Sequence, residues 1–487
     1  MIMAAVSLVL AACDDYDTFT TDRSATLQFS NDTVLFDTLI TTIPSSTKTL
    51  TVYNRGDQGL RISEVRLEAG SASPFRVNID GQDMSRSAEN RVTDFEVRRR
   101  DSIIVRIEVT LPEQNNDDVA VVEDVLRFTL ESGMEQKVPL IVSGRDAFFI
   151  QGLTLNADTT FSAQRPIVVY DSLVVAPDAT LTLSAGTQLL FHENAGLIVR
   201  GRLIAEGMLE APVVLRGDRT DHMFDYLPYD RLPSRWVGVT FTRESHDNNL
   251  NYLDLHSGLY GIRCDSTGTD VLKLTLVNSR IHNLGGHGIE LRHCRAEIAN
   301  SEISNTLGHC AYIVGGDAQF IHCTLAQFYA LSAYRGHAIH ITNQDSLGYF
   351  ALDRADFINC VATGYDDDVM MIPALNREEM PSDAANLPIN YQFFHCFLTT
   401  EVPDDELYKP RFINCQIDTL DAEMNRDKHF QLIDSHHFLY DFTPVETSPI
   451  RNIADSTYAV PYPLDRLGRS RRTDKQPDAG CYEFIQQ

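Results

Sequence analysis

Short runs of alternating apolar and polar residues dominate the chain from residue 25 to residue 146. Every second residue in a run is apolar, and Gly, Asn, Asp or Pro ends the run after a few positions. Such alternation places apolar side chains on one face of a strand, and frequent turns join the strands into antiparallel sheets. The clearest runs are 49–53, 60–62, 95–97, 103–109, 125–128 and 138–142. The pattern predicts an antiparallel β-sandwich over residues 25–146.

From about Gly152 the apolar bursts begin to repeat. Asn278, Asn300 and His322 each open a similar segment, at a spacing of 22 residues. The series continues at Asn359, His395 and Asn414, and a second series of Gly-His segments runs through 286–288, 308–310 and 336–338. Repetition near twenty residues without helical periodicity predicts a solenoid of strands. Its insertions, at 217–235, 364–392, 401–411 and 418–447, are expected to form loops.

The strand-and-turn succession at 197–201, 203–207 and 212–215 resembles the right-handed parallel β-helix of the pectate-lyase type. In that family each coil has three short strands, inward side chains stack, and Asn side chains hydrogen-bond along the axis. Residues 465–469 and 477–483 are similar to a closing segment that covers an open edge. The resemblance covers residues 150–487 and implies a β-helix surface lipoprotein.

Residues 52–56, followed by 60–62, resemble bacterial Ig-like domains, in which Asn and Gly turn the chain between two strands. Modules of that class are usually spacers. The predicted fold class is therefore all-β, with an N-terminal Ig-like β-sandwich followed by a right-handed parallel β-helix solenoid.

The N-terminus predicts export. Residues 2–12 are apolar but too few to span a bilayer, which needs about twenty, so they read as the core of a signal peptide. Residues 10–13 resemble a bacterial lipobox, which implies cleavage before Cys13 and a lipid on that residue. The expected segments are a signal peptide at 1–13 and an acidic tether at 14–24. The predicted location is the outer membrane or cell surface, with a lipid anchor.

The other eight cysteines cluster in the second half of the chain, and most of them follow His or Asn. Cysteine behaves as a small buried hydrophobe, so most are expected as stacked inward thiols rather than disulfides. Neighbouring strand residues face opposite ways, so a His-Cys dipeptide is poorly placed to bind one ion. No metal site is predicted.

Charge narrows the choice of partners. The chain carries 41 Lys and Arg against 68 Asp and Glu, a formal net charge of −27. A nucleic-acid-binding protein needs a basic face, so nucleic acid is not an expected partner. The expected partners are a polysaccharide or a surface protein, and the membrane through the lipid.

Two weak patterns suggest catalysis. Residues 286–288 resemble one motif of polygalacturonases, which hydrolyse glycosidic bonds with paired carboxylates, and this makes His287 a candidate. Asp366, Asp367 and Asp368 form a dense acidic cluster in the array and could supply the carboxylates, or bind Ca²⁺ in a lyase. The other polygalacturonase motifs are absent. The alternative is that His287 stacks in a turn ladder and that the aspartates form a solvated loop tip.

Aromatic residues in the insertions suggest sugar binding, because flat rings beside polar groups suit sugar rings. The candidates are Tyr226, Tyr229, Trp236, Tyr365 and Tyr391. The alternative is that they pin the loops onto the solenoid. The predicted function is non-catalytic glycan or partner binding, or a surface scaffold. A polysaccharide lyase or glycosidase remains the second hypothesis, and no cofactor is expected apart from Ca²⁺ in the lyase case.

Overall fold

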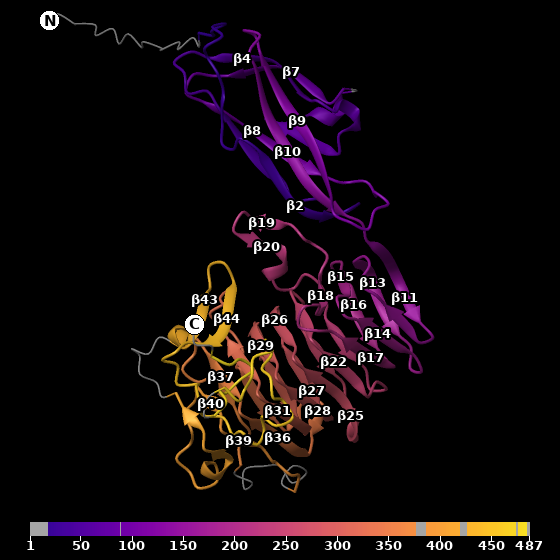
Figure 1. Ribbon diagram of the computed structural model, residues 1–487, viewed down its shortest axis with the longest axis vertical. Coiled ribbons are helices and arrows are strands. Elements are labelled where there is room, and N and C mark those ends of the chain that lie inside the picture. The colour runs from indigo at the N-terminus through magenta and orange to yellow at the C-terminus, as the bar shows by residue number, and fades with distance from the viewer. Residues whose placement is uncertain (1–17, 88, 376–385, 419–425, 474–475, 485–487) are drawn as a thin grey trace, which may run out of the picture. The chain divides into compact units, whose positions relative to one another are not determined.

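The computed structural model describes residues 18–87, 89–375, 386–418, 426–473 and 476–484, and these are almost entirely strands and turns (Figure 1). The chain divides after Asp146 into two compact units, residues 1–146 and 147–487. The predicted lipidation site Cys13 and the signal segment lie outside the described residues. Within the described part, no helix has the length and apolar character needed to cross a membrane.

The first unit contains two five-stranded sheets. One has the order β1 (Gln28–Phe29), β3 (Lys48–Tyr53), β8 (Ser102–Val109), β5 (Phe75–Ile79) and β6 (Gln82–Asp83). The other has the order β2 (Val34–Ile40), β10 (Glu135–Arg145), β9 (Ala120–Leu130), β4 (Leu60–Leu67) and β7 (Arg91–Val97). The 3-10 turns η1 (Gly70–Ala72) and η2 (Met84–Arg86) connect strands.

Both sheets contribute to one core. Phe36 of β2 packs against Phe75 of β5, with ring centroids 5.9 Å apart, and Phe29 of β1 packs against Phe128 of β9 at 5.2 Å. The strand pairs are antiparallel as expected, except that β10 pairs with β2 in parallel. An alternating pattern gives the buried face of a strand but not the direction of its neighbour, so the sequence could not reveal this exception.

The second unit is built on two large parallel sheets, of 18 and 10 strands. Pairing divides the larger sheet into two runs that share their first strands, β11 (Phe148–Leu155) and β13 (Ile167–Val175). Run A then comprises β15 (Gln188–Phe191), β18 (Val213–Gly217), β23 (Leu253–His256), β26 (Arg280–Leu284), β29 (Glu302–Thr306), β32 (Thr324–Gln327), β37 (Val361–Gly364), β40 (Phe397–Leu398) and β42 (Gln416–Ile417). Run B comprises β16 (Gly196–Val199), β21 (Val239–Phe241), β24 (Ile262–Cys264), β27 (Ile289–Arg292), β30 (Ala311–Val314), β33 (Ile339–Thr342) and β38 (Met370–Met371).

The ten-stranded sheet forms run C. Its strands are β12 (Thr159–Phe161), β14 (Thr180–Ser184), β17 (Arg202–Glu206), β22 (Asn248–Asn251), β25 (Gly268–Val277), β28 (Cys294–Ala299), β31 (Gly316–Ile321), β36 (Leu352–Ile358), β39 (Gln392–Phe394) and β41 (Phe412–Ile413). From β15 to β39 the chain visits runs A, B and C in turn, apart from two small hairpins. This order is compatible with a parallel β-helix-like solenoid (Figure 1).

Hairpins and 3-10 turns extend from the runs. The hairpins are β19 (His222–Phe224) with β20 (Leu227–Pro228), β34 (Gln344–Asp345) with β35 (Gly348–Tyr349), and β43 (Phe430–Asp434) with β44 (Leu439–Pro444). The turns are η3 (Tyr229–Arg231), η5 (Lys409–Arg411) and η6 (Arg426–His429).

Side chains stack inside and along the unit. Phe320, Phe357, Phe393 and Phe412 of run C stack ring on ring, with successive centroids 4.7, 5.2 and 5.1 Å apart.

All eight cysteines in the described part are free thiols, as expected. The backbone N–H of Cys323 donates to the sulfur of Cys360 at 3.4 Å, and that of Cys360 donates to the sulfur of Cys396 at 3.4 Å.

The recurring Asn and His residues form a column at the turns between run C and run A. The members of this turn column are Asn278, Asn300, His322, Asn359, His395 and Asn414, and φ lies between 50° and 55° at every one. Asn tolerates this left-handed conformation better than most residues. Their side chains hydrogen-bond along the stack, as Asn300 Nδ2 does to Asn278 Oδ1 at 2.6 Å and Asn359 Nδ2 does to His322 Nε2 at 3.0 Å. The predicted polar ladder is present.

Candidate functional site

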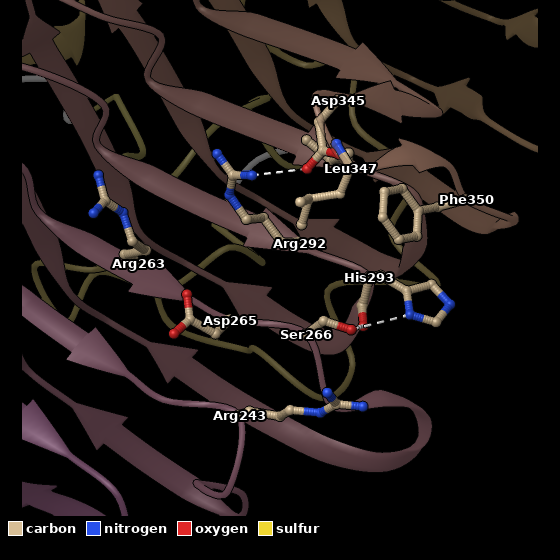
Figure 2. Close-up of a pocket in the computed structure, with 10 residues that line it drawn as sticks. Arg243, Arg263, Asp265, Ser266, Arg292, His293, Asp345, Leu347 and Phe350 are labelled. Atoms are coloured by element: carbon tan, nitrogen blue, oxygen red, sulfur yellow. Dashed lines mark hydrogen bonds and ion pairs between the residues drawn. The ribbon is translucent and has the colours of Figure 1, made fainter.

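A cavity of about 730 Å³ opens where the strands of run B end (Figure 2). The ends of β21, β24, β27 and β30 form its floor, and the β34–β35 hairpin forms a wall. Because the strands are parallel, residues just after each strand meet at one edge of the sheet. The lining residues are Arg243, Arg263, Asp265, Ser266, Arg292, His293, Val314, Asp345, Leu347 and Phe350.

Two of the three arginines are held by carboxylates. Glu290 is almost fully buried, and its two oxygens accept hydrogen bonds from Arg263 at 2.8 Å and from Arg292 at 2.6 Å. Arg292 also reaches Asp345 at 2.8 Å, which ties β27 to the hairpin wall (Figure 2). Burial opposes ionisation of Glu290, but the two guanidinium groups outweigh it and lower the pKa of that carboxyl. The network fixes both arginines in place.

Other polar groups in the cavity are free to meet a ligand. Arg243 is exposed and makes no hydrogen bond or ion pair with any described residue, and the Asp265 carboxylate accepts no hydrogen bond from the described chain. Ser266 Oγ lies 3.2 Å from His293 Nδ1, and the His293 ring packs against Phe350 with centroids 5.4 Å apart. The cavity thus presents a guanidinium and a carboxylate that are unpaired within the described chain, beside hydroxyl and aromatic groups, which suits a polar ligand.

His287 lies at the turn before β27, at the other end of that strand from the cavity, and stacks in a ladder. Its ring centroid is 5.1 Å from that of His309, and His309 is 5.4 Å from His337. The backbone N–H of His309 donates to His287 Nδ1 at 2.9 Å, and that of His337 donates to His309 Nδ1 at 2.8 Å. His309 Nε2 lies 2.8 Å from His340 Nδ1. A ring that accepts at Nδ1 carries its proton on Nε2, so His309 donates to His340.

This ladder predicts a loss of stability in acid. Burial, with neighbouring imidazoles, lowers the pKa of His309 to about 3 and that of His340 to about 4. Unfolded imidazoles take up protons near pH 6.5, so below that pH the unfolded state binds more protons and stability falls as pH drops toward these folded-state pKa values. Urea unfolding between about pH 7 and pH 4 should show a decrease on the order of 1 kcal/mol per pH unit from this pair.

The variant His340→Gln keeps an acceptor for His309 but removes one titrating ring, so its pH dependence should be shallower. His246→Gln, at an exposed histidine, provides the matched control and should keep the parent slope. An unchanged slope in His340→Gln would contradict the assignment.

The three aspartates predicted as catalytic lie on the loop before β38, each with a partner in the fold. Asp366 accepts from Arg335 at 3.1 Å, and Asp367 lies 3.4 Å from Arg426. Asp368 accepts from Thr400 Oγ1 at 2.7 Å and from the N–H of Met370 at 3.1 Å. The strands β30 and β33 separate β27, which follows His287, from β38. At roughly 4.8 Å per strand, these turns are roughly 14 Å apart, so the structure does not bring His287 and the aspartates together.

The five aromatic candidates lie in different places. Trp236 and Tyr391 are buried, at 2% and 1% exposed, and Trp236 stacks on Phe191 with centroids 4.4 Å apart. Tyr365 packs edge-on against Phe328, and the Arg219 guanidinium covers the ring of Tyr229 at 4.4 Å. Tyr226 is the most exposed of the five at 44%, and it stacks between Phe224 and His436. These rings do not line the cavity.

The sequence reading missed the cavity residues. Arg243, Arg263 and Arg292 come from three successive coils and belong to no motif. One sequence signal for these residues was present. Arg263 and Glu290 each stand between apolar residues in a short strand, so the alternation predicts that both side chains lie on the face of the sheet away from the core. Pairing of β24 with β27 aligns these two residues directly.

No protein-family model matches the chain, and no curated protein matches it. Among solved structures, the PapD-like domain 7 of human CEP192 is 16% identical with a TM-score of 0.17, over 30% of this chain and 97% of that one. The Escherichia coli chaperone DraB is 18% identical with a TM-score of 0.17, over 25% and 55%. A Porphyromonas gingivalis protein of unknown function is 17% identical with a TM-score of 0.17, over 27% and 60%.

Proposed function

We propose that this chain is an exported, lipid-anchored surface protein that binds an acidic glycan without cleaving it. In this proposal Cys13 carries the lipid, residues 14–24 form the tether and residues 25–146 form an Ig-like spacer. Residues 150–487 form a right-handed parallel β-helix that presents the ligand site. The alternation of runs A, B and C and the hydrogen-bonded turn column support the β-helix.

The observation that carries the binding proposal is the arginine-lined cavity. Three arginines converge on one hollow in a chain with a net charge of −27. Glu290 and Asp345 pair with Arg263 and Arg292, which leaves Arg243 as the cavity guanidinium without a counter-ion among the described residues. A guanidinium recognises a carboxylate by paired hydrogen bonds. The Phe350 ring and the hydroxyl of Ser266 suit the face and the hydroxyl groups of a sugar. A uronate-containing oligosaccharide combines these features.

The surroundings of the predicted catalytic residues favour binding over cleavage. An inverting glycosidase needs two carboxyl groups about 6.5–9.5 Å apart around the scissile bond. Asp366, Asp367 and Asp368 are hydrogen-bonded or paired within the fold, and His287 Nδ1 is occupied by the backbone of the ladder. Hydrolase or lyase activity is therefore the second choice.

The test is the binding of short oligogalacturonates, measured by calorimetry, with neutral galacto-oligosaccharides for comparison. Arg243→Ala should weaken binding of the acidic oligomer by about 10- to 100-fold, since a hydrogen bond to a charged group contributes roughly 1.5–3 kcal/mol. Arg200→Ala is the matched control, because Arg200 is also exposed but is paired with Glu244 at 2.9 Å.

Two results would count against this function. Equal affinity for acidic and neutral oligomers, or unchanged affinity in Arg243→Ala, would remove the role of the cavity. Release of unsaturated uronate products, followed by their ultraviolet absorbance, would show cleavage and favour the lyase.

A further inference from the structure

Two histidines and an aspartate meet on the outer face of run A, on a different run from the arginine-lined cavity. Asp254 and His256 belong to β23, and His282 belongs to β26. The strand register pairs His256 with His282, so the two rings stack with centroids 4.9 Å apart. Asp254 Oδ1 lies 2.8 Å from His256 Nδ1 and 3.2 Å from His282 Nε2. Each residue offers one atom that could bind a metal ion, and these three atoms lie within 4.8 Å of one another.

Three guanidinium groups, those of Arg216, Arg280 and Arg466, lie near this trio and act on Asp254 electrostatically. Arg216 pairs with Asp230 at 3.1 Å, and Arg280 pairs with Glu302 at 3.1 Å. Arg466 acts on the same Glu302 carboxylate and donates to the carbonyl of Ser279 at 3.3 Å, and none of the three guanidinium groups hydrogen-bonds to Asp254. Among the described residues, the Asp254 carboxylate has hydrogen-bond partners only in the two imidazoles.

Burial and hydrogen bonding also single out the cluster. The side chains of His256 and His282 are 11% and 10% exposed, whereas that of Asp254 is 22% exposed. His282 Nδ1 is buried and has no hydrogen-bond partner within the described chain. Burying a polar nitrogen without a partner costs free energy, and the ring is held instead through Nε2, the nitrogen that faces Asp254. The exposed edge of Asp254 leaves a path for an ion.

We propose that Asp254, His256 and His282 bind a divalent transition-metal ion of the Zn²⁺ class. Two imidazoles and one carboxylate are ligands that Zn²⁺ prefers, whereas Ca²⁺ and Mg²⁺ require oxygen ligands. Bonds of about 2.0–2.1 Å place tetrahedral ligand atoms roughly 3.4 Å apart, so the observed spacings need only small side-chain shifts. Three protein ligands leave a fourth position on the exposed side.

No sequence motif marks this site, because its members come from successive coils and only Asp254 and His256 are close in the chain. Their spacing of two residues puts both side chains on one face of β23. The parallel register then brings His282 beside them. Side chains alternate between the two faces of a strand, which separates the His and Cys of a dipeptide. The same alternation puts residues at equivalent positions of neighbouring strands on one face, where they can bind one ion together.

The experiment titrates the metal-free full chain with Zn²⁺ by calorimetry and with Co²⁺ by its visible absorption. One equivalent should bind to the parent, with the Co²⁺ spectrum of a four-coordinate site. His256→Ala, His282→Ala and Asp254→Asn should each weaken binding by at least about 100-fold, since losing even an outer-shell partner costs 10- to 100-fold. Asp254→Asn is isosteric, so this variant should keep the shape of the site and fold as the parent does. Circular dichroism checks the folding of each variant.

His246→Ala is the matched control. His246 and Asp247 also form a His-Asp pair, at 2.9 Å, but both are more than half exposed and no third ligand joins them in the described structure. This variant should bind Zn²⁺ as the parent does. The proposal fails if the parent binds no stoichiometric Zn²⁺, if the Asp254→Asn protein folds and binds normally, or if Ca²⁺ displaces Zn²⁺ at equal concentration.

Discussion

Replacing Arg471 with alanine should destabilise the second unit by about 3–5 kcal/mol, the range expected when one partner of a buried ion pair is removed. The Arg471 side chain is fully buried and donates to Glu483 at 2.5 Å, to Asn300 Oδ1 at 2.6 Å and to the carbonyl of Gly480 at 3.1 Å. Without it, Glu483 remains buried without its charged partner. Equilibrium urea unfolding measures the change.

The location of the damage distinguishes this effect from a general loss of stability. The closing segment, residues 465–469 and 477–483, packs against β29 and β32, since Tyr482 donates to Glu302 and the Cys481 N–H donates to Thr324 Oγ1. Hydrogen exchange in Arg471→Ala should therefore accelerate first in the closing segment and at Asn300. Arg472→Ala is the control, because the side chain of Arg472 is exposed. Its removal should lower the free energy of unfolding by less than about 0.5 kcal/mol. Equal effects of the two variants would contradict the role of Arg471.

Replacing Phe357 with alanine is the second substitution with a large expected effect, about 3–5 kcal/mol. Its ring is fully buried and lies between those of Phe320 and Phe393, so its removal leaves a cavity that a regular stack of strands cannot close. Both neighbours also lose a stacking partner. Thermal and urea unfolding measure the loss.

Phe224→Ala provides the comparison for this core substitution. Phe224 is 51% exposed and has one close ring neighbour, Tyr226, so its loss should cost about 1 kcal/mol or less. A third variant, Phe357→Leu, keeps most of the volume and should fall between the two. If Phe357→Ala were no more destabilising than Phe224→Ala, the aromatic stack would not contribute as the structure indicates.

The sequence predicted the repeating elements well, because period-two alternation and recurring Asn are local signals. The turn column shows this clearly: Asn278 and Asn300 recur because each coil needs a left-handed residue with an amide at the same turn. The inward orientation of the Cys323 and Cys360 thiols was predictable for the same reason. Each directly follows a residue of the turn column, so its side chain has the same orientation in every coil.

The candidate sites were much less predictable. Arg243, Arg263 and Arg292 line one cavity only because parallel pairing brings three successive coils into register. A short motif such as the one around His287 signals a local turn, and that turn serves the ladder. The acidic run 366–368 likewise binds Arg335 and Thr400 within the fold. Charge density along a sequence does not reveal which charges are already neutralised in space.

The stacked thiols of Cys323, Cys360 and Cys396 make it possible to follow how the second unit opens. Burial raises the pKa of Cys323, Cys360 and Cys396 well above the usual thiol range, so these sulfurs are inert toward alkylation while they stay enclosed. The three residues occupy successive coils. Each can react only when its own coil separates from its neighbours, so the relative labelling rates of the native cysteines rank the opening free energies of adjacent coils without any introduced probe.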